Sequence, residues 1–244
     1  MINKTVIYGG GSGIGLATAE KLLSSGEAVH VTGRAKSSVS RVLDLGATCT
    51  IGDVLDPEFF KQVTDDAGDN IHGLVYAVGT INLKGFQRLE TDDFIQDFKI
   101  NALGAAQAVR AALKSLKKSP RPASVVLFSS VAANKGFPFH TSVGMAKGAL
   151  NGLVVSLAAE LAPKVRVNAI APSLTRTSLA EPILKNDAAA KSLEQAHPLK
   201  RLGHAEDIAS VAAFLLSDEA SWITGQIMGV DGGRSTLMDP PKGI

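Results

Sequence analysis

A glycine-rich stretch near the N-terminus, YGGGSGIG at residues 8–15, has the composition of a phosphate-binding turn. It directly follows an apolar, strand-like run and opens a helix-like pattern, and this context makes a glycine motif specific. Gly9 permits the tight turn, Gly13 lets the backbone approach a pyrophosphate, and Gly15 allows close helix packing. The N-terminus of the following helix would also offer unpaired N–H groups to a phosphate. The alternative interpretation of the motif is a glycine-rich turn that only reverses the chain. The predicted dinucleotide contacts are Gly9, Ser12, Gly13, Ile14 and Gly15.

The end of the second strand-like run indicates which dinucleotide would bind. A carboxylate at this point would bind the ribose hydroxyls of NAD, but the stretch VHVTGRAK places Gly33 and Arg34 there. A guanidinium suits a 2′-phosphate by its charge and its bidentate geometry. The sequence therefore predicts NADP in preference to NAD. A solvated surface arginine is the alternative, and it would leave the cofactor open.

Short apolar runs alternate with longer amphipathic ones along the chain, which is typical of βαβ units. A parallel sheet built from such units is covered by helices on both faces. The sequence predicts an α/β fold, a doubly wound parallel sheet (Rossmann fold) of about seven strands in three α/β/α layers. No linker or repeat divides it, so residues 1–244 should form a single NADP-binding domain. The expected strands are residues 4–9, 28–33, 47–54, 73–78, 123–130, 166–172 and 226–232.

Capping residues indicate where the intervening helices begin and end. Gly26 stands where a glycine would end the first helix, and Asp56 followed by Pro57 is typical of an N-cap and first turn. Thr91 is the expected N-cap of a long helix, and residues 205–216 should form another near the C-terminus.

Composition argues against nucleic acid and membranes as partners. A net charge of +2 is too small to require either. The densest basic run, residues 114–121, falls at a predicted helix end, where cations interact favourably with the helix dipole; a phosphate- or nucleic-acid-binding patch is the alternative. No run reaches the roughly 20 apolar residues that span a bilayer, and the single cysteine, Cys49, fits a reducing compartment. We expect a cytoplasmic protein with a small-molecule substrate and no metal site.

Several further segments stand in the order found in one known family. They include VLFSSVAANKG at residues 126–136, VRVNAIAPSLTRT at residues 165–177 and the run from Pro198 to Gly233. Together with the glycine turn, they make the chain similar to the short-chain dehydrogenase/reductase family over essentially its whole length. Outside the catalytic helix, Tyr76 and Ala77 replace asparagines of the family pattern, and Ser173 replaces a glycine.

The resemblance implies a role for individual residues. It implies an active-site asparagine at Asn101, a catalytic serine at Ser130 and a lysine, Lys147, that holds the nicotinamide ribose and supplies positive charge. Further cofactor contacts implied by the resemblance are Asp53, Val54, Gly79, Pro172 and Thr175.

The family's most specific element is a tyrosine four residues before the lysine, and this chain lacks it. Counting back four residues from Lys147 gives Val143, and counting the family's usual thirteen residues forward from Ser130 gives Val143 again. In the family's carbonyl reduction the tyrosine protonates the oxygen, and the lysine lowers a phenolic pKa that starts near 10. Valine has no proton to donate, and general acid catalysis is typically worth about 100- to 10,000-fold.

His140 is the predicted replacement acid. It lies seven residues before Lys147, so helical spacing would put both on one face, and an unperturbed histidine pKa of about 6.5 suits proton donation near neutrality. Bacterial enoyl-acyl-carrier-protein reductases, which are similar in fold, carry their tyrosine seven residues before the lysine, and HTSVGMAK resembles that pattern locally. A helix N-cap at Thr141 or Ser142 would leave His140 in the preceding loop, and an ordinary loop histidine is the alternative.

Three functions are compatible with these residues. The favoured one is an NADP(H)-dependent oxidoreductase that acts on a carbonyl or conjugated alkene and takes its proton from His140, Ser130 or water. A catalytically silent NADP-binding sensor or scaffold is the second, and a non-redox enzyme in the same pocket is the third. Helices expected over residues 91–115 and 142–161 resemble the family's dimerising pair, which implies a homodimer or homotetramer.

Overall fold

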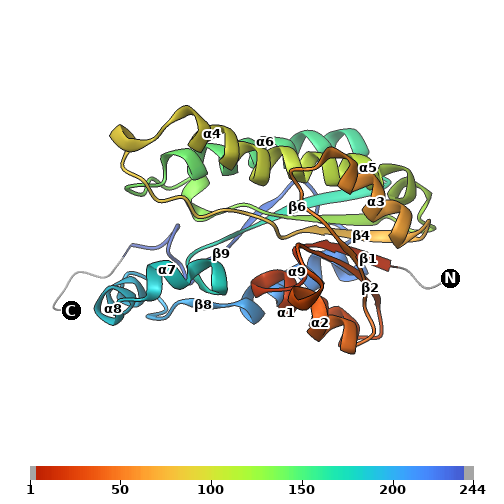
Figure 1. The fold of residues 1–244 in the computed structure, drawn as a ribbon, viewed down its shortest axis with the longest axis horizontal. Helices are drawn as coiled ribbons and strands as arrows, with labels where there is room; N and C mark the ends of the chain where they lie inside the picture. Colours follow the sequence, from red (N-terminus) through yellow and green to blue (C-terminus); the bar gives the residue numbers. More distant parts are fainter. Residues whose placement is uncertain (1–3, 239–244) are drawn as a thin grey trace.

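All seven apolar runs predicted as strands join one parallel sheet (Figure 1). The computed structural model describes residues 4–238, so residues 1–3 and 239–244 of the predicted domain lie outside it. The strand order is β3-β2-β1-β4-β5-β6-β9, and each neighbouring pair is parallel. This order confirms the predicted doubly wound sheet. The strands are β1 (Lys4–Tyr8), β2 (Ala28–Gly33), β3 (Thr48–Ile51), β4 (Ile71–Tyr76), β5 (Ala123–Phe128), β6 (Val165–Pro172) and β9 (Ile227–Val230).

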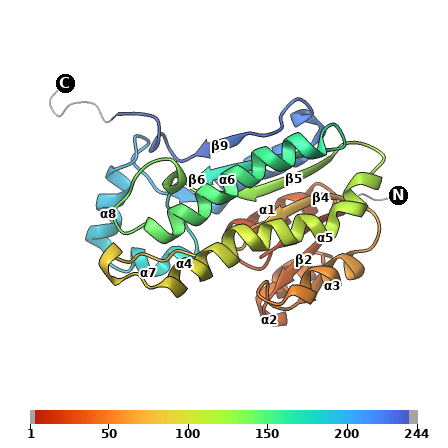
Figure 2. The ribbon, with the colours of Figure 1, turned by 90° about the horizontal axis from the view of Figure 1, so that it is seen from above.

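Helices cover both faces of this sheet. Figure 1 shows α3 to α6 on one face and α1, α2 and α9 on the other, and Figure 2 looks down on the face that α5 and α6 cross. Successive strand residues point to opposite faces, so Leu74 joins the core under α3, α5 and α6 while Val75 joins the core over α1, α2 and α9. The helices are α1 (Gly13–Ser24), α2 (Lys36–Asp44), α3 (Pro57–Ala67), α4 (Thr91–Phe98), α5 (Gly104–Lys118), α6 (Thr141–Leu161), α7 (Glu181–Leu184), α8 (Asp187–Gln195) and α9 (Ala205–Leu216).

Most of the predicted helix signals are confirmed. Asp56 caps α3, because its Oδ1 accepts the N–H of Glu58 at 3.0 Å, and Pro57 opens the first turn. Gly26 follows the C-cap of α1 with φ +79, in the left-handed region that favours glycine. Helix α9 spans the predicted residues 205–216.

The start of α4 differs from the prediction by one residue. Its N-cap is Glu90 rather than Thr91. The carboxylate of Asp93 accepts the N–H of Glu90 at 2.9 Å and fixes the chain one residue earlier.

The long helix predicted over residues 91–115 is not continuous, because a π-helical turn, Lys99–Leu103, separates α4 from α5. The hydroxyl of Tyr76 donates to the carbonyl of Ile100 at 2.7 Å inside this turn. Gly104 makes room for it, since a Cβ there would lie 2.1 Å from the tyrosine oxygen. The tyrosine that replaces a family asparagine is therefore used to brace the π-helical turn.

Among the described residues, helix α6 is the one helix whose length and composition would suffice to cross a membrane. It contains Lys147, Asn151 and Glu160, so it does not contradict the expectation that no run reaches about 20 apolar residues. Its buried residues Leu150, Val154, Ala158 and Leu161 belong to the core between the sheet and this helical layer. Packing of this kind is what a core helix requires, so its length and composition carry no argument for a membrane.

Candidate active site

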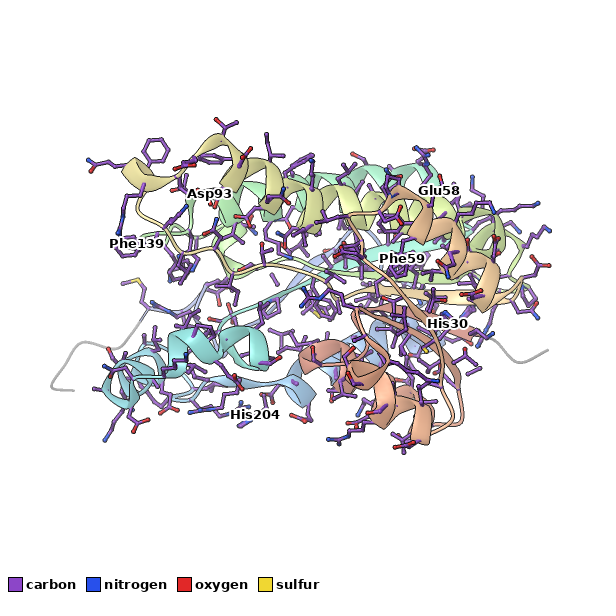
Figure 3. All side chains as sticks on the ribbon, in the orientation of Figure 1. His30, Glu58, Phe59, Asp93, Phe139 and His204 are labelled. Atoms are coloured by element: carbon purple, nitrogen blue, oxygen red, sulfur yellow. The ribbon has the colours of Figure 1, made fainter. Side chains whose placement is uncertain are left out.

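The carboxyl ends of β4, β5 and β6 border a cavity of about 310 Å³. Ligands of open parallel sheets bind at this edge, near the point where the strand order reverses, which here is between β1 and β4. Figure 3 shows Phe139 at this end of the molecule and His30 near the other end, so the hydrogen bonds of His30 to Thr48 and Thr50 lie outside the site. The cavity lining includes Gly79, Ser130, His140, Val143, Lys147, Pro172, Ser173, Thr175 and His197.

The glycine turn presents the open start of α1. Gly9 and Gly13 have φ of +78 and +50, values that favour glycine. A Cβ on Gly15 would stand 2.2 Å from the carbonyl oxygen of Gly9, so the helix packs directly on the turn. Ser12 is the N-cap but makes no side-chain capping bond, which leaves the first N–H groups of α1 for another acceptor. A phosphate group fits this cradle in charge and hydrogen bonding.

The predicted adenosine contacts lie at the same edge, beyond the turn. Arg34 is exposed and follows directly on the last residue of β2. Asp53 is exposed after β3, and its carboxylate accepts the N–H of Leu55 at 2.9 Å. Val54 is half-buried and packs against the core. Their roles toward a nucleotide remain predictions.

Ser130 faces the cavity with a hydroxyl that can still donate. It follows β5 and caps a short 3₁₀ turn, where its Oγ accepts the N–H of Ala132 at 3.1 Å. Because that bond uses a lone pair, the O–H hydrogen is left for a ligand oxygen.

Lys147 lies on α6 and is only 7% exposed. Its Nζ donates to the carbonyl of Phe128 at 2.6 Å. Burial lowers the pKa of this ammonium to about 8, because the charged form loses hydration, while Asp97 opposes the shift. Near neutral pH the group still carries most of its positive charge.

Asn101 does not line the cavity but lies fully buried in the π-helical turn. A Cβ on Gly79 would stand 3.0 Å from Asn101 Oδ1 and 3.4 Å from Lys147 Nζ. A side chain at position 79 would therefore crowd the Asn101 amide, and the absence of one leaves this side of the Lys147 ammonium uncovered. The Asn101 amide donates to Thr80 Oγ1 at 2.7 Å and to the carbonyl of Asp97 at 2.8 Å.

Thr80 and Asp97, which are not among the predicted site residues, hold Asn101 in place. The Thr80 hydroxyl donates to Asp97 Oδ1 at 2.6 Å, and the Thr80 N–H reaches Asn101 Oδ1 at 3.3 Å. Asp97 is 2% exposed. Its position four residues before Asn101, on the same helical face, was the signal available in the sequence.

His140 lines the cavity from just outside α6. It is the N-cap of that helix, with φ −104, so the helix does not include it. Its Nδ1 lies 2.7 Å from the carbonyl of Pro138, and its ring is centred 5.5 Å from that of Phe137. A carbonyl oxygen only accepts, so Nδ1 carries a hydrogen and Nε2 is the nitrogen left to gain or lose a proton. Val143, 5% exposed, and Lys147 line the same cavity.

The loop after β6 closes the opposite wall. Pro172, the last residue of β6, and Thr175 line the cavity on either side of this loop, and the Thr175 hydroxyl donates to the carbonyl of Ser173 at 2.9 Å. Strands β7 (Thr175–Arg176) and β8 (Gly203–His204), two residues each, hold the loop and are too short to leave a periodic signal. The Ser173 side chain meets His197, a residue that the sequence analysis did not identify because its surroundings show no periodic pattern.

Comparisons with known proteins match nearly the whole chain. A family model described as enoyl-(acyl carrier protein) reductase matches residues 9–235. A tropinone reductase homolog from Arabidopsis thaliana is 34% identical over 239 residues, which cover 93% of this chain and 92% of that protein. A 3alpha-hydroxysteroid dehydrogenase from Mediterraneibacter gnavus is 32% identical over 245 residues, which cover 94% and 96%. The solved structure of ElxO with NADP bound superimposes with a TM-score of 0.89 at 27% identity, covering 97% of this chain and 100% of that chain.

Proposed function

Because this chain belongs to the short-chain dehydrogenase/reductase family, we propose that it is an NADP(H)-dependent oxidoreductase that interconverts a carbonyl or conjugated alkene and its reduced form without a tyrosine donor. One observation carries the proposal: Ser130, His140, Val143 and Lys147 line a single cavity. Three of these side chains can bond to or stabilise a reacting oxygen. The fourth is the apolar residue at the position of the family's tyrosine.

The residues at the edge of the sheet support NADP as the cofactor. The uncapped start of α1 suits the pyrophosphate, and the exposed guanidinium of Arg34 can pair with a 2′-phosphate in bidentate fashion. Asp53 and Val54 are the proposed adenine-side contacts, with Pro172 and Thr175 on the nicotinamide side. Bound NADPH supplies the hydride in the direction of reduction.

Two side chains are suited to a substrate oxygen that becomes negative. The Ser130 hydroxyl keeps its hydrogen for donation, since its lone pair holds the N–H of Ala132. Lys147 is buried beside the cavity and adds positive charge where little water screens it. Together they bind and polarise the oxygen, while Asn101 stays behind Gly79 as a support.

His140 is the proposed proton donor. Its Nδ1–H bond to Pro138 orients the ring and leaves Nε2 as the exchangeable position. A doubly protonated imidazole can then donate from Nε2 to the substrate oxygen and return to the neutral form. Val143 fills the adjacent wall without taking part in proton transfer.

A catalytically silent NADP-binding sensor or scaffold is the second candidate. One observation favours it: the Lys147 ammonium and the Asn101 amide both hydrogen-bond to groups of the protein itself. In such a protein the site would bind the nucleotide and keep its shape without catalysing a reaction.

The test is NADPH consumption by the purified protein against a panel of ketones, quinones and enoyl thioesters. We expect oxidation with at least one acceptor class and a lower rate with NADH. Tight NADPH binding with no consumption by any acceptor would instead support the sensor.

We also propose that copies of the chain associate as a homodimer or homotetramer through α6. Met145 and Val155 are 52% and 53% exposed on this helix, and association would remove this apolar surface from water. Light scattering of the purified protein should give a multiple of the chain mass of 25.3 kDa.

A further inference from the structure

Ser173 and His197 form a hydrogen-bonded pair on the cavity wall that the proposed redox chemistry does not use. Ser173 Oγ lies 2.8 Å from His197 Nε2, and both residues line the cavity. His197 is 3% exposed and follows α8, whereas Ser173 is half-buried and directly follows β6. The pair therefore joins two separate segments of the chain at a site open to a ligand.

The hydrogen bonds of His197 indicate that Ser173 is the donor in this pair and His197 the acceptor. His197 Nδ1 lies 2.7 Å from the carbonyl oxygen of Leu193, which can only accept. In the neutral imidazole Nδ1 therefore carries the hydrogen, and Nε2 presents its lone pair to the Ser173 hydroxyl. A hydroxyl that donates to an imidazole nitrogen, with the imidazole held by a third group, is the arrangement of an activated serine nucleophile.

Neighbouring groups support the same chemistry. The Thr175 hydroxyl donates to the Ser173 carbonyl and fixes the serine backbone. The N–H of Leu174 has no hydrogen-bond partner among residues 4–238. The N–H that follows a nucleophilic serine is the group that stabilises the oxyanion in α/β-hydrolases.

The two cavities beside the pair suit an acyl substrate and water. Leu179, Ile183 and Leu193 line the larger cavity, which offers an apolar wall to an acyl chain. A second cavity of about 200 Å³ borders the same serine and histidine and is also lined by Arg201 and Asp231, so it offers a polar place for water.

We propose that Ser173 and His197 are a nucleophile and general base that transfer the acyl group of an activated ester or thioester with an apolar acyl chain. Ser173 Oγ attacks the acyl carbonyl carbon while its proton passes to His197 Nε2. The bond to the leaving alcohol or thiol breaks, and the leaving group takes that proton. Water then attacks the acyl-serine, gives one proton to His197, and releases the carboxylic acid as the proton returns to Ser173.

The test uses p-nitrophenyl acetate and p-nitrophenyl butyrate without added cofactor, so its outcome is independent of the oxidoreductase proposal. We expect a burst of p-nitrophenolate, a protein mass increased by one acyl group, and peptide mapping of that group to Ser173. Ser173→Ala should abolish the burst, and His197→Asn should slow it by about 100-fold or more. Ser210→Ala, at an exposed serine on α9, is the matched control and should react like wild type.

Mapping in the wild-type protein decides the question even if a variant folds poorly. Acylation at Lys147, or no acylation above the level of Ser173→Ala, would overturn the proposal. So would an undiminished burst in a folded His197→Asn protein, because the histidine would then only brace the loop.

Discussion

Placing a tyrosine at Val143 in a protein that lacks His140 should restore the missing proton donor. His140→Ala removes the proposed acid, and we expect single-turnover reduction to slow by about 100- to 10,000-fold, or roughly 3 to 5 kcal/mol in activation free energy. In the double variant His140→Ala/Val143→Tyr, the phenol would stand one helical turn before Lys147 on the face that lines the cavity. The double variant should regain most of the rate that His140→Ala loses.

The rate that the introduced tyrosine restores, and its cost in stability, depend on two features of the site. Burial lowers the pKa of Lys147 to about 8, so the group keeps a positive charge near pH 7 and this charge would lower the pKa of the introduced phenol. Val143 is 5% exposed, so the larger ring must enter the cavity of about 310 Å³, and overpacking is expected to cost roughly 1 to 3 kcal/mol of stability.

The assay follows oxidation of bound NADPH by stopped flow with an acceptor that the wild-type protein reduces. His140→Ala/Val143→Phe is the matched control, because it adds the same ring without the hydroxyl and should stay slow. Equal rates for the tyrosine and phenylalanine double variants, with NADPH binding unchanged, would refute the assignment of Val143 to the donor position.

Three further predictions concern Arg34, the glycine turn and the buried lysine. Arg34→Ala should bring the NADP and NAD dissociation constants together in calorimetric titrations, and unchanged selectivity would rule out a contact with the 2′-phosphate. Gly15→Ala places a Cβ 2.2 Å from the Gly9 carbonyl and should lower the unfolding free energy by about 1 to 3 kcal/mol and weaken NADPH binding, unlike Gly136→Ala, whose Cβ meets nothing within 4 Å. Burial lowers the pKa of Lys147 from 10.5 to about 8, so the unfolded chain holds more protons between these values and stability should rise with pH across them. In urea titrations the unfolding free energy of wild type minus that of Lys147→Met should increase from about pH 8 to pH 10.5, and a flat difference would argue against a buried ammonium.

Local sequence patterns were sufficient to predict the sheet and most helix ends, because each depends on a short stretch of chain. The seven apolar runs became the seven strands, and Asp56 and Gly26 became the expected caps. The π-helical turn that separates α4 from α5 could not be predicted from a short stretch of sequence. It depends on the Tyr76 hydroxyl, which reaches Ile100 from a strand 24 residues earlier in the sequence.

In the candidate site too, some residues could be predicted from the sequence, whereas others depend on contacts between distant segments. The family resemblance and helical spacing together pointed to Ser130, His140, Val143 and Lys147, and all four line the same cavity, although His140 caps α6 instead of joining it. Ser173 and His197 could not be paired from sequence, because they are 24 residues apart and meet only when the segments after β6 and α8 fold against each other.

The most direct measurement is the rate of NADPH oxidation in a single turnover, compared between the wild-type protein and His140→Ala with the same bound acceptor. A non-tyrosine donor at His140 predicts turnover in wild type and a loss of about 100-fold or more in the variant, with NADPH affinity unchanged. Equal rates in the two proteins would contradict His140 as the donor, and the absence of NADPH oxidation by wild type with every acceptor class would contradict the proposed reductase activity itself.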